Sequence, residues 1–118
     1  MSMDIKIIQN PIKRAELIEI AKEGFGDVVK AVIDIEQKIL AVGGELHSDE
    51  EVVLMEKYNS KRENTWGLNI YPKKPTDEWI EFDSMVNIKP AHGNRSRDIE
   101  DQNIQEKIKK IVRKLITD

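Results

Sequence analysis

The stretch "VVKAVIDIEQKILAVGG", residues 28–44, decides the fold class of this 118-residue chain. It contains two runs rich in valine and isoleucine, separated by the polar residues "EQK". Because β-branched residues favour extended strands, the pattern predicts two strands joined by a tight turn near Glu36 and Gln37. The second run, "KILAV", is apolar at consecutive positions, which is typical of a strand covered on both faces. We therefore expect it to be a central strand.

The residues before this hairpin predict a strand and then a helix. The strand is "IKII", and the helix follows in "NPIKRAELIEIAKEGFG". Asn10 can cap this helix, Pro11 suits its first position, and Gly24 can end it. The residues predicted to form its buried face are Ile12, Ala15, Leu17, Ile18, Ile20 and Ala21.

The C-terminal segment carries the strongest helical periodicity of the chain. Asp101 can cap a helix whose apolar residues recur three or four positions apart. These residues are Ile104, Ile108, Ile111, Val112, Leu115 and Ile116. We expect this face to cover the sheet.

The segment "ELHSDEEVVLMEKYN", residues 45–59, follows the double glycine. Ser48 and Glu51 have the spacing of a capping box, which predicts a helix from Asp49 to about Tyr58. The short apolar run "VVLM" within it is also compatible with a buried strand. At this point both structures remain open.

Two further strands are expected in "TWGLNIY", residues 65–71, and "EWIEFDSMVNI", residues 78–88, joined by the exposed connection "PKKPTD". Alternation in the second places Trp79, Glu81 and Asp83 on one face. We expect Trp66 and Trp79 to be core residues. The element order predicts an α+β fold: a single compact domain, residues 1–118, with a largely antiparallel sheet and about three helices packed on it.

Composition excludes several classes of protein. No apolar run approaches the roughly 20 residues of a membrane-spanning helix, and the first residues have no signal-peptide layout. The chain has no cysteine, which excludes disulfides, a thiol nucleophile and cysteine-ligated metals. We therefore expect a cytoplasmic protein. The net charge of −3 argues against wholesale binding to nucleic acid.

The first candidate site is "AVGGELHS", where a strand meets two glycines and a predicted helix start. Gly43 and Gly44 allow close approach of a ligand, and helix N-termini bind anions. His47 could be a general acid or base, with Glu45 or Asp83 orienting its ring. The alternative is that the glycines only make the turn and the polar side chains are only solvated.

The second candidate site is "HGNRSR", residues 92–97. Arg95 and Arg97 could hold a phosphate or carboxylate in bidentate fashion, while Asn94 and Ser96 add donors. In the alternative interpretation the arginines pair with nearby acids, which are Asp98, Glu100 and Asp101.

The sequence provides no diagnostic metal or cofactor motif. A mixed metal site of His47 with Glu45, Glu81 or Asp83 is conceivable but lacks a recognised spacing. The double glycine lacks the lysine and the spacing of a nucleotide-binding loop. We therefore assign no metal ligands and no cofactor.

Four blocks of the chain from about Val28 onward form a specific set. They are "VIDIEQKILAVGGELHSDEE", "WGLNIYP", "EWIEFDSMVNIKP" and "GNRSRDIED". Through these blocks the chain resembles a family of small uncharacterised prokaryotic proteins, a domain-of-unknown-function family. This resemblance implies a cytoplasmic single-domain protein and brings no activity, cofactor or catalytic residue with it.

The leading hypothesis is a pocket for an anionic, phosphate-bearing small molecule. It would form if the polar blocks converge, and the residues expected to line it are Glu45, His47, Asp83, Asn94, Arg95 and Arg97. If the protein is an enzyme, His47 would act in a hydrolytic or phosphoryl-transfer step. A non-catalytic interaction module or homodimer is the alternative. RNA binding is a weaker one, because basic residues outnumber acidic ones from Met85 to Asp118.

Overall fold

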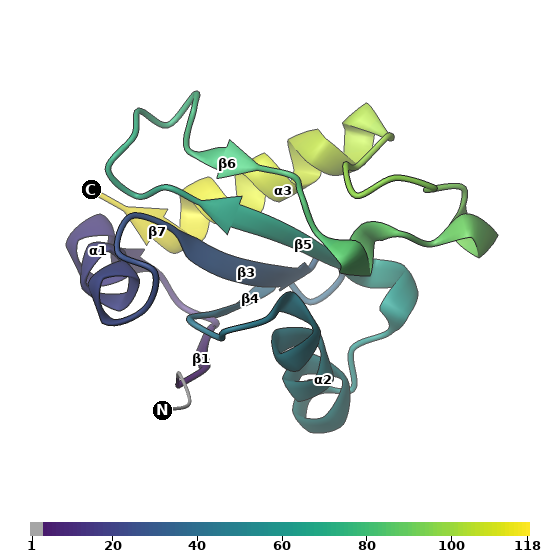
Figure 1. The fold of residues 1–118 in the computed structure, drawn as a ribbon, viewed down its shortest axis with the longest axis horizontal. Helices are drawn as coiled ribbons and strands as arrows, with labels where there is room; N and C mark the ends of the chain where they lie inside the picture. Colours follow the sequence, from purple (N-terminus) through teal and green to yellow (C-terminus); the bar gives the residue numbers. More distant parts are fainter. Residues whose placement is uncertain (1–3) are drawn as a thin grey trace.

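The computed structural model describes residues 4–118, and its centre is a five-stranded antiparallel sheet in the order β1-β4-β3-β5-β6 (Figure 1). Two very short strands, β2 and β7, pair in parallel beside it. The strands are β1 (Lys6–Ile8), β2 (Ile12–Lys13), β3 (Val29–Asp34), β4 (Ile39–Val42), β5 (Thr65–Ile70), β6 (Ile80–Glu81) and β7 (Ile116–Thr117). The helices are α1 (Arg14–Glu23), α2 (His47–Tyr58) and α3 (Gln102–Leu115), with 3₁₀ turns at Arg62–Asn64, Met85–Asn87 and Pro90–His92.

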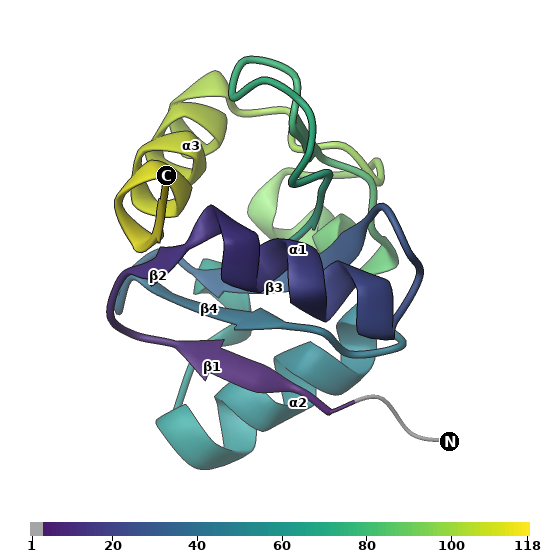
Figure 2. The same ribbon diagram turned by 90° about the vertical axis from the view of Figure 1, so that its left-hand side faces the viewer.

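The helices cover both faces of the sheet. Figure 2 shows α1 and α3 on one side of it and α2 on the other. Alternation along β3 explains the two layers: Ala31 and Ile33 belong to the larger core under α1 and α3, whereas Val32 packs with Leu54 of α2. The predicted α+β class is therefore confirmed, with helices on both faces.

The predicted hairpin is present, and its turn is held by one carboxylate. Asp34 at the end of β3 accepts hydrogen bonds from the backbone N–H groups of Glu36 and Gln37, at 2.9 and 3.1 Å. Such side-chain bonds to the next residues stabilise turns without Asn-Gly. β4 is interior and fully buried, as expected, but β3 is the middle strand of the five.

Helix α3 agrees closely with its predicted pattern. It begins after Asp101, whose carboxylate accepts a hydrogen bond from the backbone N–H of Asn103 at 2.8 Å. Its buried residues are Ile108, Ile111, Val112 and Leu115. The N-cap and the apolar stripe are both local features, so sequence alone could find them.

Helix α1 starts later than predicted. Asn10 and Pro11 lie outside it, because Ile12 and Lys13 pair instead with Ile116 and Thr117 near the other end of the chain. Pairing over such a separation leaves no trace in a local pattern. The buried face is also narrower than expected, consisting of Leu17, Ile20 and Ala21, and the predicted Ala15 is exposed.

The segment 47–58 is a helix, so the alternative strand does not form. The predicted capping box is wrong. The N-cap residue is Leu46, and Glu51 accepts hydrogen bonds from Thr65 and Arg62 instead of closing the helix start. The carboxylate of Glu51 therefore takes part in a tertiary contact and does not cap the helix.

The predicted strand 78–88 is mostly not a strand. Only Ile80–Glu81 pair with β5, and the chain then turns through Met85–Asn87. The predicted common face does not form either, because Trp79 is buried in the core under α3 while Glu81 is exposed.

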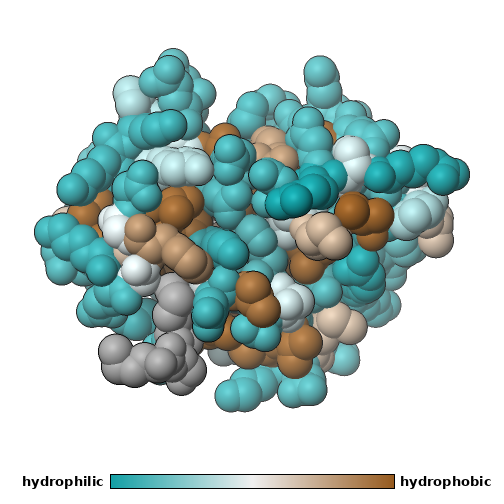
Figure 3. All heavy atoms as spheres, in the orientation of Figure 1, coloured by the Kyte–Doolittle hydropathy of each residue, from teal (hydrophilic) through white to brown (hydrophobic). Residues whose placement is uncertain are grey.

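The surface drawn in Figure 3 is mostly hydrophilic, and hydrophobic residues appear there in small groups between polar ones. Within residues 4–118, none of the helices combines the length and the apolar character needed to cross a membrane.

Candidate functional site

A cleft of about 230 Å³ lies on the α2 side of the sheet, where the start of α2 meets β3, β5 and the turn after β6. We call it the α2 cleft. Its polar lining side chains are Lys30, His47, Ser48, Asn69, Asp83, Ser84 and Arg97. Apolar side chains at its rim include Leu46 and Met85. The cleft is therefore polar, small and open to solvent.

The two strand residues of the cleft are placed by sheet register. Lys30 of β3 lies opposite Asn69 of β5. Their neighbours Ala31 and Leu68 point to the opposite face and are fully buried there. Because side chains alternate along strands, Lys30 and Asn69 must emerge together on the α2 face.

The start of α2 contributes backbone N–H groups. The N-cap residue Leu46 has an apolar side chain, which cannot accept hydrogen bonds from the first turn. The first N–H groups of a helix have no intrahelical partners and carry partial positive charge. His47 and Ser48, the first two residues of α2, both line the cleft. This end of the helix thus favours an anion.

His47 is held in a defined orientation. Its Nε2 lies 2.9 Å from the carbonyl oxygen of Leu68, and a carbonyl can only accept, so Nε2 carries the proton. Burial lowers the pKa of His47, and the nearby charge of Lys30 lowers it further. The bond to Leu68 and the neighbouring Asn69 and Asp83 oppose this effect. At neutral pH the ring is therefore neutral, with Nδ1 free of a proton.

The side chain of Asn69 has one satisfied end and one unsatisfied end. Its amide nitrogen donates to Oε1 of Glu81 at 2.9 Å and to the carbonyl of Asp83 at 3.3 Å. Within the described chain, its buried Oδ1 meets no donor. Buried acceptors are rarely left without a partner. This one is enclosed by protein atoms next to His47, so the ring atom Nδ1 of His47 is the acceptor suited to a ligand.

Arg97 and Asp83 form an ion pair at the mouth of the cleft. Nε of Arg97 lies 2.7 Å from Oδ1 of Asp83, and the two side chains are 57% and 48% exposed. An ion pair this exposed contributes little to stability, because water screens it. Arg97 can therefore turn to an anionic ligand at small cost.

A buried carboxyl group lies in the first turn of α2. Glu50 is fully buried, and its Oε2 accepts a hydrogen bond from the N–H of Gly44 at 2.9 Å. Burial raises the pKa of Glu50 well above its usual value. The charged side chains that line the cleft are two cations, Lys30 and Arg97, and one anion, Asp83.

One wall of the cleft is fixed by Asn87, which acts as a substitute for a strand. Its side-chain oxygen accepts from the N–H of Gly67 at 2.7 Å, and its amide nitrogen donates to the carbonyl of Gly67 at 2.9 Å. The same nitrogen donates to the carbonyl of Arg97 at 3.0 Å. Asn87 thus completes the edge of β5 beyond the short β6 and ties down the backbone of Arg97.

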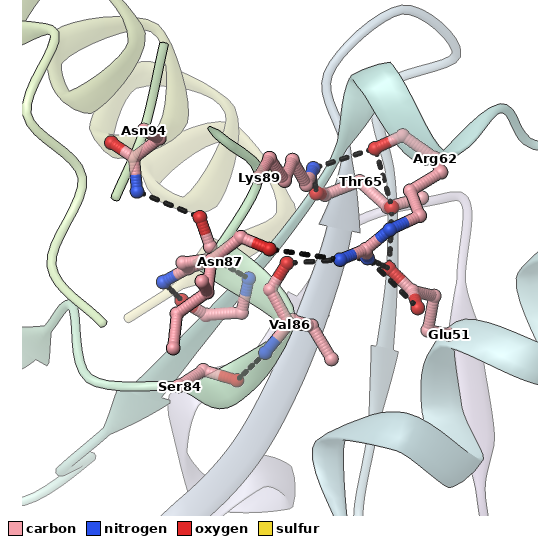
Figure 4. A network of polar contacts seen from close by, with 10 residues as sticks. Glu51, Arg62, Thr65, Ser84, Val86, Asn87, Lys89 and Asn94 are labelled. Atoms are coloured by element: carbon pink, nitrogen blue, oxygen red, sulfur yellow. Dashed lines mark hydrogen bonds and ion pairs between the residues drawn. The ribbon is translucent and has the colours of Figure 1, made fainter. Parts of the chain in front are cut away.

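A second polar network holds the same wall from behind (Figure 4). Lys89 is 3% exposed, donates to the carbonyls of Arg62 and Thr65, and lies 3.9 Å from the ring centre of Trp66. Burial lowers its pKa to about 8. Arg62 also bonds Glu51 of α2 and the carbonyl of Val86, so the wall is anchored to the helix.

The predicted glycines and Glu45 lie outside the α2 cleft. Gly43 has a φ of +88°, and a Cβ there would lie 2.9 Å from the carbonyl oxygen of Asp4, so the turn itself requires glycine. Gly44 donates its N–H to Glu50. Glu45 is exposed and is not one of the lining residues.

Three of the four ligand-binding residues predicted in "HGNRSR", namely Asn94, Arg95 and Ser96, also lie outside it. Asn94 is 4% exposed and bonds the loop internally, donating to the carbonyls of Asn87 and Asp98. The backbone N–H groups of Arg95 and Ser96 both donate to Glu100. The structure therefore brings Arg97 of this block to His47 and Asp83, and the rest of the block shapes the loop that carries it.

Sequence reasoning missed Lys30, Ser48 as a lining residue, and Asn69. A signal for Lys30 was present, because it is a charged residue inside a run of apolar strand residues. Its neighbour across the sheet could not be identified without the β3–β5 register. For a metal site, no group of three or more histidine, cysteine, aspartate or glutamate side chains in residues 4–118 is placed to hold an ion.

Comparison with known proteins gives one match. The model of the family described as "Protein of unknown function (DUF5674)" matches residues 6–115. The chain belongs to this family. The match to the DUF5674 model covers every helix and strand except the short β7. It includes all the residues that line the α2 cleft. No curated protein and no solved structure matches the chain.

Proposed function

We propose that this DUF5674 protein binds a small phosphate-bearing ligand in the α2 cleft. The observation that carries the proposal is the convergence of Lys30 and Arg97 on the start of α2. These are three different kinds of anion-binding group: an ammonium, a guanidinium, and helical N–H donors.

The lining also favours particular chemistry beside the phosphate. Asp83 and Nδ1 of neutral His47 are acceptors, so they suit hydroxyl or amino groups of the ligand. When Lys30 and Arg97 hold the phosphate, a hydroxyl group of the ligand can lie next to His47. In a hydrolytic or phosphoryl-transfer step, His47 is the base that would accept the proton of this hydroxyl. The volume of about 230 Å³ fits a small metabolite or the phosphate end of a nucleotide.

The proposal also includes the cytoplasmic location that the cysteine-free sequence favours. A homodimeric or purely interacting protein is the alternative, and RNA binding the weaker one. The small size of the hydrophobic groups on the face drawn in Figure 3 gives a protein interface there little support.

A nitrogen–proton NMR titration with inorganic phosphate, adenosine monophosphate and a short RNA tests the proposal. We expect saturable shifts at residues 46–48, 69 and 97 with at least one phosphate compound. A Lys30→Gln/Arg97→Gln variant should bind at least tenfold more weakly. Lys107→Gln/Lys114→Gln, which removes two exposed charges on α3 outside the cleft, is the matched control and should bind normally.

Unchanged affinity in a folded Lys30→Gln/Arg97→Gln variant would exclude the α2 cleft as the site. Shifts that appear only with RNA, spread over α3 and vanish with added salt, would favour the RNA alternative.

A further inference from the structure

A second hollow lies on the opposite face of β6 and is larger than the α2 cleft. It has a volume of about 620 Å³ and runs between β6 and α3. We call it the α3 groove. Ile80 and Phe82 line its strand side, and Lys109, Lys110 and Arg113 line its helix side. It shares no lining residue with the α2 cleft.

The strand side of the groove is a free sheet edge. In the part of the chain that the structure describes, β6 is the last strand of the sheet and pairs only with β5. The N–H of Tyr71 donates to the carbonyl of Trp79 at 2.8 Å, so these two residues form a hydrogen-bonded pair. In an antiparallel ladder such pairs alternate, and the next pair, Ile70 with Ile80, is not hydrogen-bonded. The N–H and C=O of Ile80 therefore point away from β5, toward the free edge.

The edge has features that would accept one more strand. An unpaired row of backbone groups is a template for an extended chain, and proteins usually protect such rows. Here Ile80 and Phe82, which are partly buried against the core under α3, offer an apolar contact beside the backbone groups. Extended peptides that add to a sheet edge gain affinity from the main chain and specificity from alternate side chains.

The helix side supplies two cations without an ion-pair partner among the described residues. Lys109 is close to Glu106 at 3.5 Å. Within residues 4–118, no carboxylate lies within 4.0 Å of the side-chain nitrogens of Lys110 or Arg113. Lys110 and Arg113 are one helical turn apart and so lie on the same side of α3. Three acids, Asp77, Asp98 and Glu106, also line the groove. Asp98 and Glu106 lie near the start of α3, whereas Lys110 and Arg113 lie in its C-terminal half.

We infer that the α3 groove binds a short acidic segment of a partner protein, which adds to the free edge of β6 as an extra strand. Main-chain bonds form to Ile80, and acidic side chains at alternate positions meet Lys110 and Arg113. Apolar side chains of the segment cover Phe82. The occupant is a peptide because the N–H and C=O of Ile80 can bond to the main chain of another strand. It is acidic because its negative side chains pair with Lys110 and Arg113.

The probe is a pentapeptide in which glutamate and valine alternate, blocked at both ends. In a nitrogen–proton NMR titration we expect saturable shifts at Ile80, Phe82 and residues 109–113. A pentapeptide with lysine in place of glutamate should not bind. One with proline in place of valine should lose at least tenfold in affinity, because proline has no N–H to donate.

Two matched variants test the charge. Lys110→Glu/Arg113→Glu reverses the groove cations and should weaken binding of the acidic peptide at least tenfold. Lys107→Glu/Lys114→Glu makes the same charge change on exposed positions of the same helix outside the groove, and should bind within about twofold of the wild type.

Several results would overturn the inference. One is the absence of saturable shifts at millimolar peptide, and another is equal binding of the lysine peptide. A third is a response of the groove to adenosine monophosphate but not to the peptide, which would indicate a small-molecule site. None of these outcomes bears on the α2 cleft, because the two titrations use different variants and report on different residues.

Discussion

Replacement of Asn87 by alanine is predicted to destabilise the protein strongly, although no charge and little apolar surface is lost. Asn87 is fully buried and its side chain replaces a strand along the edge of β5. Alanine removes the donor and the acceptor together. Gly67 is buried too, so its N–H and C=O are both left without a partner.

The size of the destabilisation follows from the N–H and C=O groups of Gly67, which both lose their partner. Each buried backbone group that loses its partner costs about 1–3 kcal/mol, which gives a total of about 2–6 kcal/mol for Gly67. The carbonyl of Arg97 is only partly buried, so water can replace the third bond. We expect a loss of about 3 kcal/mol out of the 5–15 kcal/mol that is typical of a domain.

Urea unfolding followed by tryptophan fluorescence measures this loss, since Trp66 and Trp79 are both buried. With a urea dependence of about 1–3 kcal/mol per M, the midpoint should fall by about 1–3 M. Asn103→Ala, an exposed asparagine on α3, is the control and should change the stability by less than about 0.5 kcal/mol.

A loss below about 1 kcal/mol for Asn87→Ala, at an unchanged urea dependence, would contradict this role of Asn87. It would mean that the backbone of Gly67 finds other partners. Hydrogen exchange in the wild type gives a check that needs no variant, because the amide of Gly67 should exchange as slowly as its neighbours in β5.

Two further predictions concern the same wall. A Cβ on Gly67 would lie 2.5 Å from Cβ of Ser84 and 2.8 Å from Cγ2 of Val86, so Gly67→Ala should cost at least about 1–3 kcal/mol in urea unfolding and shift the amide signals of residues 84–87; a neutral substitution would contradict this packing. Burial lowers the pKa of Lys89 from 10.5 to about 8, so the folded state releases its proton first and the unfolded state binds more protons between these values. Relative to Lys89→Met, the wild type should therefore gain stability as the pH rises from about 8 to 10.5, and a constant difference in the free energy of unfolding over this range would show that the pKa is not lowered.

The fold was predictable wherever its cause is local. The valine and isoleucine runs of β3 and β4 and the apolar stripe of α3 each bury a periodic set of residues, and Asp101 caps within two residues of itself. The errors share a different cause. A local motif predicts a helix start at Pro11, a capping box at Glu51 and a strand after Glu81. In the structure each of these segments instead makes contacts with a distant part of the chain.

Local sequence patterns predict the class of fold and the polar glycine-flanked segment before α2, because hydrophobic periodicity, capping and turn chemistry act over a few residues. Which polar residues share a site depends on long-range contacts. Lys30 and Asn69 meet because of strand register, and Arg97 reaches Asp83 because Asn87 holds its backbone. These contacts join residues that are distant along the chain, and the free energy that selects them comes from packing the whole core.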